Sequence, residues 1–238
     1  MNTEAKKKIQ IVLTVAIAIA AIRAGYIVYD RHAANAVPVK KEEVYADADL
    51  YVRPKGLHAY DLKSMRVLIK MPVWVRVGYS VTYYPYNEEQ HRPDFSHEAG
   101  LLGPIEKLQV RDVVLNTAPT APGQEQIMAV FQKEGKDYAF SAGYSQGDDF
   151  YPVTDGMLFI EDPHVLYKHW KPEVWDAIEK HEVRPGMNEL QTSFAIGVGL
   201  MLGSGDNYER TLKYPNGGKP LTVTFRAGKA VEIVPVKE

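Results

Sequence analysis

The sequence contains no cysteine among its 238 residues. This absence excludes disulfide bonds, a thiol nucleophile, a cysteine-based metal site and a lipid attached through cysteine. Positive charge is not in excess either, because 28 lysines and arginines stand against 30 aspartates and glutamates. Nucleic-acid binding needs a basic stripe, so the composition predicts no nucleic-acid partner.

Charged residues are also scarce in the N-terminal part of the chain. Residues 9 to 29 contain one charged side chain, Arg23, and no proline. A helix of that length spans the hydrocarbon core of a bilayer. The lysine cluster at residues 6 to 8 favours leaving the first end in the cytoplasm. We therefore expect a cytoplasmic tail at residues 1 to 8, a transmembrane helix at residues 9 to 29, and a body outside the cytoplasm.

A cleaved signal peptide is the alternative interpretation of the same segment. The basic start and the apolar run of residues 9 to 22 also fit a secretory signal, after which the body would be secreted. The small-residue site at residues 34 to 36 lies well past the apolar run. Residues 30 to 43 are polar, contain Pro38 and show no periodicity, so they are predicted to be a linker.

The region from residue 44 to 163 has the pattern of strands. In the run from 72 to 79, Val73 and Val75 share one face and Trp74 takes the other, which is typical of a half-buried strand. Similar segments end at proline- and glycine-containing turns. Their ranges are 108 to 115, 126 to 131, 137 to 142 and 157 to 160. We predict a β-rich barrel or sandwich domain over residues 44 to 163.

Part of this region has a recognisable motif. Residues 48 to 53 read Ala-Asp-Leu-Tyr-Val-Arg, and residues 67 to 75 contain a Val-Trp-Val strand pattern. This arrangement resembles the opening of bacterial Src-homology-3-like domains, with Lys70-Met71 where that family has Lys-Gly.

Residues 164 to 238 show two helix signals followed by three strand signals. Pro172 is a typical helix start, and Asn188 with Gln191 forms a capping pattern before a second helix that stops at Gly197. The glycine-rich segment from 197 to 205 is predicted to be a flexible connector. Alternating strands follow at 208 to 214, 221 to 225 and 229 to 234. The overall expectation is an α+β chain that ends in a helix-helix-three-strand antiparallel module.

Period-two alternation divides the side chains of these three strands between two faces. The face expected to cover the helices consists of Tyr208, Leu212, Tyr214, Leu221, Val223, Phe225, Val231 and Ile233. The opposite face is polar and of mixed charge, which suits a transient protein partner. The candidate protein-binding residues on it are Lys213, Thr222, Thr224 and Arg226.

The order of motifs from residue 182 to 234 resembles the SmpA/OmlA (BamE-like) family of bacterial envelope proteins. The matching stretches are 186 to 191, the pair Ile196-Gly197, 212 to 214 and 221 to 231. The resemblance implies a protein-binding module without catalytic residues. Together with the N-terminal segment it predicts a single-pass protein of the bacterial inner membrane, with its body in the periplasm and an envelope protein or cell-wall component as partner. That family is usually lipid-anchored through a cysteine, which this chain lacks.

An enzyme is the second functional hypothesis. The stretch from Gly143 to His169 holds a Gly-x-Ser-x-Gly pattern around Ser145, and it is also rich in aspartate and histidine. A hydrolase elbow needs a strand-turn-helix context, and His164 and His169 are spaced five apart, which does not align on one helix face. The sequence thus predicts no catalytic residues, no cofactor and no metal, while a periplasmic hydrolase or metal-dependent enzyme stays open as the alternative.

Tyrosines are concentrated between residues 79 and 86. Tyr83, Tyr84 and Tyr86, with Phe95 nearby, could stack on a glycan or peptide, or could cover the end of a small barrel. The sequence leaves both interpretations open.

Overall fold

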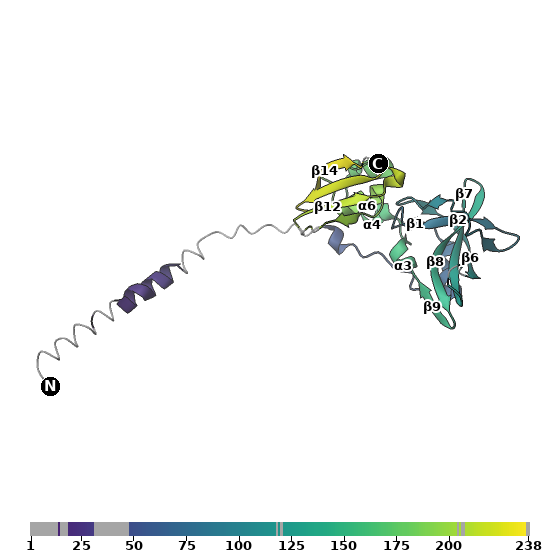
Figure 1. Ribbon diagram of the computed structural model, residues 1–238, viewed down its shortest axis with the longest axis horizontal. Coiled ribbons are helices and arrows are strands. Elements are labelled where there is room, and N and C mark those ends of the chain that lie inside the picture. The colour runs from purple at the N-terminus through teal and green to yellow at the C-terminus, as the bar shows by residue number, and fades with distance from the viewer. Residues whose placement is uncertain are drawn as a thin grey trace, which may run out of the picture. The chain divides into compact units, whose positions relative to one another are not determined.

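The computed structural model describes residues 14, 19 to 30, 48 to 117, 119, 121 to 203, 205 and 208 to 236 (Figure 1). The chain divides into two compact units, Met1–Leu50 and Tyr51–Glu238. In the first unit, residue 14 and residues 19 to 30 are helical and exposed.

The structure corrects the predicted fold class, which included a transmembrane helix. No helix within the described ranges is both long enough and apolar enough to cross a membrane. Of the predicted span at residues 9 to 29, the structure describes residue 14 and residues 19 to 29. The tail at 1 to 8 and residues 31 to 43 of the linker lie outside the described residues.

The second unit is mixed α+β and consists mostly of sheets. Its strands form a seven-stranded, a three-stranded and a four-stranded sheet. The seven-stranded sheet contains β2 (Thr82–Asn87), β3 (Arg92–Pro93), β4 (Gly100–Leu101), β6 (Val110–Thr117), β7 (Gln124–Lys133), β8 (Lys136–Gln146) and β9 (Asp149–Pro152). The three-stranded sheet contains β1 (Val73–Val75), β5 (Lys107–Leu108) and β10 (Leu158–Phe159). The four-stranded sheet contains β11 (Leu200–Leu202), β12 (Glu209–Tyr214), β13 (Leu221–Arg226) and β14 (Lys229–Pro235).

The helical elements are short. They are η1 (Ala48–Tyr51), α2 (Leu62–Met65), η2 (Arg66–Lys70), α3 (Thr154–Met157), α4 (Pro163–Leu166), α5 (Pro172–Glu179), α6 (Glu189–Ile196) and η3 (Asn216–Gly218). The stretch around Leu50, within the region predicted to be β-rich, is a 3₁₀ turn. Leu50 and Tyr51 are both exposed, and neither belongs to a sheet of the described residues.

The two longest strands of the seven-stranded sheet, β7 and β8, are buried on both faces. Residues 127 to 131 of β7 alternate between two apolar clusters. Ile127, Ala129 and Phe131 belong to the first core, which also contains Val73, Val75, Leu108 and Leu158 of the three-stranded sheet. Met128 and Val130 pack on the opposite side, against Ala139 of β8. The seven- and three-stranded sheets thus share one core.

Strand β1 is buried on both faces and supplies two different cores. Val73 and Val75 enter the first core, whereas Trp74 points to the second core, with Phe159, Trp170 and Phe194. Opposite orientation of successive side chains along a strand explains the division. The second core also contains Leu212, Tyr214, Val223 and Phe225 of the C-terminal sheet.

Helix α6 begins and ends as its sequence predicts. The Asn188 side chain accepts a hydrogen bond from Gln191 N at 2.8 Å, and Gln191 Oε1 accepts one from Asn188 N at 2.9 Å. This reciprocal capping box satisfies two N–H groups that a helix start leaves free. The helix ends at Gly197, whose φ of 90° lies in the region that favours glycine. A Cβ at this position would also come 2.7 Å from the Gly78 carbonyl oxygen.

The C-terminal sheet has four strands in the order β11-β12-β13-β14, not the three that were predicted (Figure 1). The extra strand, β11, lies in the segment expected to be a flexible connector, and it pairs with β12 through Leu200↔Lys213 and Leu202↔Thr211. All of its residues are exposed, so it has no alternation by which a sequence pattern could reveal it.

A β-bulge changes which side chains β14 turns inward. The register shifts between Thr224 and Phe225, so that Phe225 pairs with Ala230. Ala230 is therefore buried, and Val231 is 45% exposed. The prediction of Val231 on the buried face is wrong, because one extra residue in a strand reverses the faces beyond it.

Candidate functional site

The four candidate protein-binding residues lie together on the outer face of the C-terminal sheet. Lys213 is directly opposite Thr222, and the Thr224 hydroxyl is 3.0 Å from that of Thr211. Arg226 donates to Glu209 Oε1 at 2.8 Å. Their role in binding stays a prediction.

An ion pair within the sheet engages some of the charged side chains on this outer face. The hydrogen bond from Arg226 to Glu209, followed by the charge of Glu209, raises the pKa of the Arg226 guanidinium. Exposed pairs of this kind contribute little to stability and are screened by salt. The charge of Arg226 is therefore already engaged within the sheet.

The edge of the same sheet has a feature that the sequence pattern did not reveal. Within the described residues β11 has a neighbouring strand on one side only, β12. Its three side chains are large, apolar and exposed: Leu200 by 71%, Met201 by 54% and Leu202 by 44%. The sequence signal is a run of large apolar residues between Gly199 and Gly203. Exposed apolar edge strands are ready templates for pairing with another chain.

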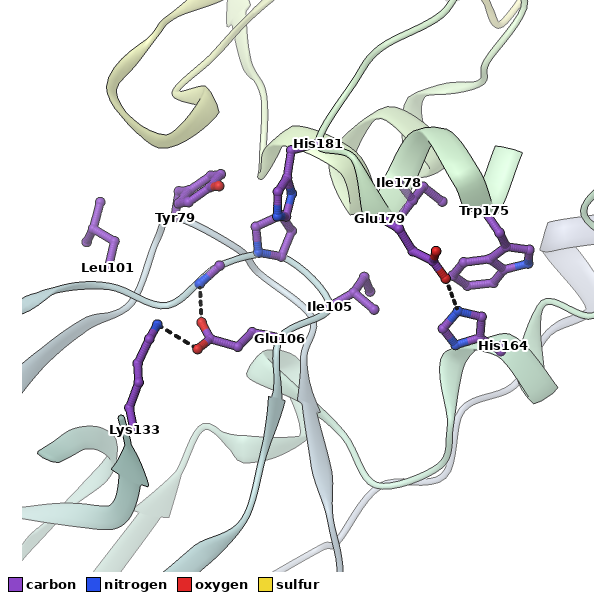
Figure 2. Close-up of a pocket in the computed structure, with 12 residues that line it drawn as sticks. Tyr79, Leu101, Ile105, Glu106, Lys133, His164, Trp175, Ile178, Glu179 and His181 are labelled. Carbon is purple, nitrogen blue, oxygen red and sulfur yellow. Dashed lines mark hydrogen bonds and ion pairs between the residues drawn. The ribbon is translucent and has the colours of Figure 1, made fainter. Parts of the chain in front are cut away.

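A cleft of about 480 Å³ lies elsewhere in the second unit. One wall comes from Leu101 at the end of β4 and Ile105 in the segment before β5, and the other from α5, with Trp175 and Ile178 (Figure 2). Tyr79 also lines it, with a φ of 57° and with burial raising the pKa of its hydroxyl. A cleft with an apolar lining and a few convergent polar groups has the ordinary make-up of a binding pocket.

An ion pair closes one end of this cleft. Figure 2 shows Lys133 and Glu106 pointing toward each other, with Lys133 Nζ 2.7 Å from Glu106 Oε1. The other carboxylate oxygen accepts a hydrogen bond from Gly103 N at 2.8 Å. Burial lowers the pKa of Lys133, but the hydrogen bond and the charge of Glu106 raise it by more. Lys133 is therefore held charged, and the ion pair joins the loop before β5 to the end of β7.

Two histidines line the other parts of the cleft. His164 stacks on Trp175 with ring centroids 4.0 Å apart, and its Nε2 lies 3.5 Å from Glu179 Oε1. His181 Nδ1 donates to the Ala195 carbonyl oxygen at 2.9 Å. His169 is not in this cleft; its ring is next to those of Tyr167 and Trp170. Across the ranges that the structure describes, no group of three or more histidine or acidic side chains is placed to hold a metal ion.

The Gly-x-Ser-x-Gly pattern does not form a nucleophile elbow. Ser145 lies within the continuous strand β8, buried and paired with Glu125 on one side and Phe150 on the other. An elbow needs the serine at a sharp turn from a strand into a helix. Gly143 has a different purpose here, because a Cβ at that position would lie 2.4 Å from the Tyr151 carbonyl oxygen. The glycine therefore permits close approach of β9.

The structure divides the tyrosine cluster between the two faces of β2. Tyr83 packs edge-on against Phe131 and Tyr138 in the first core. Tyr84 packs against Phe95, and Tyr86 lies with it on the opposite face. The tyrosines therefore do not form one continuous stacking surface, and ligand binding by the cluster stays a prediction.

The turn after β3 holds a carboxylate whose pKa is lowered by hydrogen bonds. Asp94 Oδ1 accepts hydrogen bonds from the Ser96 hydroxyl and from Ser96 N at 3.1 Å, and Asp94 Oδ2 accepts one from His97 Nδ1 at 2.8 Å. These bonds, with those of Ser96 the stronger, lower the pKa of Asp94 from 3.8 to about 2.

We expect the Asp94 carboxylate to titrate near pH 2 in the folded protein, as followed by carboxyl-carbon NMR. Because its pKa is lower in the folded state, the turn's contribution to stability is complete above pH 3.8 and is lost as the pH falls toward 2. Ser96→Ala should raise the midpoint toward 3.8. A midpoint already near 3.8 in the unchanged protein would contradict the hydrogen-bonded turn.

Taken together, these features define a mixed α+β protein, built mostly of sheets, in the part of the chain that the structure describes. Comparisons with models of known protein families, with curated proteins and with solved structures found no match.

Proposed function

We propose that this chain is a non-catalytic protein-interaction module whose C-terminal sheet receives an extended segment of another protein along β11. The observation that carries the proposal is the exposed apolar edge formed by Leu200, Met201 and Leu202. The free edge of β11 offers main-chain donors and acceptors to a partner strand. Natural proteins usually protect such an edge with charge, proline or a covering element.

The side chains of β11 also define what the partner would meet. Leu200 and Leu202 share a face with Lys213 and Thr211, while Met201 is on the side of Leu212. Every second side chain of an added strand would thus lie beside the two leucines, and we expect these side chains to be apolar. Polar side chains of the partner would lie farther out, over the outer face of the sheet. Apolar contact next to a polar, mixed-charge surface is the usual composition of a transient interface. The resemblance to the SmpA/OmlA family favours a bacterial envelope protein as this partner.

The test uses photo-crosslinking and amide exchange in the full chain. A photoreactive residue at Leu202 should give one discrete crosslinked product, and the amides of residues 200 to 202 should exchange more slowly in the isolated complex. The double variant Leu200→Lys and Leu202→Lys should remove both signals without lowering the melting temperature, since both positions are exposed.

A matched control carries the same charges elsewhere. Tyr151 and Val153 are also exposed, by 44% and 43%, and lie outside the C-terminal sheet. Their replacement by lysine should leave crosslinking at Leu202 unchanged. Crosslinking that persists at the original level in the β11 variant would overturn the proposal. A product of twice the chain's own mass would overturn it as well, in favour of self-association.

A further inference from the structure

A second cavity, of about 390 Å³, lies beneath the connection from α6 to β11. We call it the arginine pocket because Arg76 and Arg210 both line it. Tyr214, at the end of β12, is also part of its wall. None of these residues belongs to the exposed apolar edge of β11.

Tyr214 is fully buried, and its hydroxyl has no hydrogen-bond partner among the described residues. Burial raises the pKa of that hydroxyl, the charge of Glu189 raises it further, and the charge of Arg210 lowers it. Tyr214, Glu189 and Arg210 all line the arginine pocket. An unpaired buried hydroxyl is costly, and a bound polar ligand would remove that cost.

The tyrosine ring cannot turn away to find another partner. Gly199 passes directly over it, and a Cβ at that position would lie 2.6 Å from Tyr214 Cζ. On its other side the ring packs toward Phe225 in the second core, with centroids 6.4 Å apart. The hydroxyl is therefore fixed in place, as a preorganised donor for a ligand should be.

One of the charged groups that line the pocket, the Arg76 guanidinium, is left without a carboxylate partner among the described residues. Arg210 Nη2 lies 2.5 Å from Glu189 Oε2, so these two neutralise each other. Arg76 donates from Nη1 to the Asp155 carbonyl oxygen at 3.3 Å and lies over the Phe159 ring, 5.4 Å from its centroid. Within the described part of the chain it has no carboxylate partner. Its guanidinium is thus available to an anion that carries a single charge.

The rest of the lining is apolar. Val77, Leu190, Phe194 and Val198 supply it, while the Ser193 hydroxyl is already donating to the Leu190 carbonyl oxygen at 2.8 Å. A ligand that fits must therefore combine one anionic group with an apolar part. A single unpaired positive group matches one negative charge, which disfavours a phosphate dianion.

We infer that the arginine pocket binds an organic carboxylate with an apolar substituent, held by the Arg76 guanidinium and the Tyr214 hydroxyl. A guanidinium binds a carboxylate with two parallel hydrogen bonds, and a tyrosine hydroxyl can donate to one of its oxygens. The apolar part would lie against Phe194 and Leu190. A small aliphatic or aromatic acid and the C-terminal carboxylate of a peptide share this chemistry.

Calorimetric titration of the full chain with defined probes tests this inference. The probes are 3-phenylpropionate, its neutral amide, N-acetyl-alanyl-phenylalanine with a free carboxylate, and inorganic phosphate. At least one of the two carboxylates should bind with a Kd on the order of 1 mM or tighter, and the amide should not bind measurably. The tighter of the two carboxylates identifies the source, free acid or peptide end.

Two variants locate the binding. Arg76→Met should weaken carboxylate binding by about tenfold or more, whereas Arg92→Met, at an exposed position on β3, should not change it. Tyr214→Phe should weaken binding as well, yet raise the melting temperature of the free protein, because it removes a buried hydroxyl that has no partner.

Three results would overturn the inference. They are no binding of either carboxylate, equal binding of acid and amide, and binding of phosphate in preference to the carboxylates. A loss of stability in Tyr214→Phe would also contradict it, since the hydroxyl would then be engaged within the protein. None of these results depends on whether β11 receives a partner strand.

Discussion

Replacing Phe225 by alanine is expected to lower the free energy of unfolding by about 3 to 5 kcal/mol. The side chain is 1% exposed and belongs to the second core, where it packs between the sheet and α6. Alanine would lose the transfer free energy of the ring and leave a cavity that the neighbouring residues fill only in part. Urea denaturation followed by circular dichroism measures the change.

Val231→Ala is the matched control on the neighbouring strand. Because the bulge turns Val231 outward, we expect a change within about 0.5 kcal/mol. The double charge reversal Lys213→Glu with Arg226→Glu should likewise leave the melting temperature nearly unchanged. A cost for Val231→Ala similar to that of Phe225→Ala would mean that β14 is paired without the bulge.

Replacing Trp74 by alanine is expected to cost about 3 to 5 kcal/mol as well. Trp74 lies in the middle of β1, buried between Phe159 of β10 and Lys107 of β5. Its ring belongs to the second core, whereas its neighbours Val73 and Val75 belong to the first. We therefore expect the loss to appear in the tertiary signals of the aromatic residues around α5 and α6, as recorded by near-ultraviolet circular dichroism.

Lys107→Ala separates burial of the tryptophan ring from its contact with a cation. Lys107 Nζ lies 5.4 Å from the centre of the Trp74 ring, and the lysine is exposed. An exposed cation–π contact contributes about 0.5 to 1 kcal/mol, so this variant should cost no more than that. If Trp74→Ala costs no more than Lys107→Ala, the ring does not join the second core as described.

Local sequence signals located much of the secondary structure. Pro172 begins α5, and Asn188 with Gln191 begins α6, as predicted. The three strands β12, β13 and β14 also lie close to their predicted ranges. These features depend on groups a few residues apart, so the chemistry that determines them is present in the sequence itself.

Predictions from local sequence patterns were wrong where the structure depends on a contact with a distant segment, or where the side chains have no buried face. Strand β11 exists because β12 pairs with it, and its exposed side chains provide no period from which to predict it. Val231 is outward because of a bulge that depends on how β13 and β14 align. The expected transmembrane helix rested on the length and apolar composition of one segment and on the lysines before it, and no helix within the described ranges is long and apolar enough to cross a membrane.

The sequence by itself determined where α5, α6 and the last three strands begin and end, because capping groups, turn residues and alternation act between near neighbours. It also determined that no cysteine chemistry is available. Only the tertiary structure decided that Trp74 joins the second core and that Arg76 lines the same cavity as Tyr214. Tyr214 is far from Trp74 and Arg76 in the chain. The burial of the Trp74 ring and the lack of a partner for the Tyr214 hydroxyl arise only when distant segments pack together.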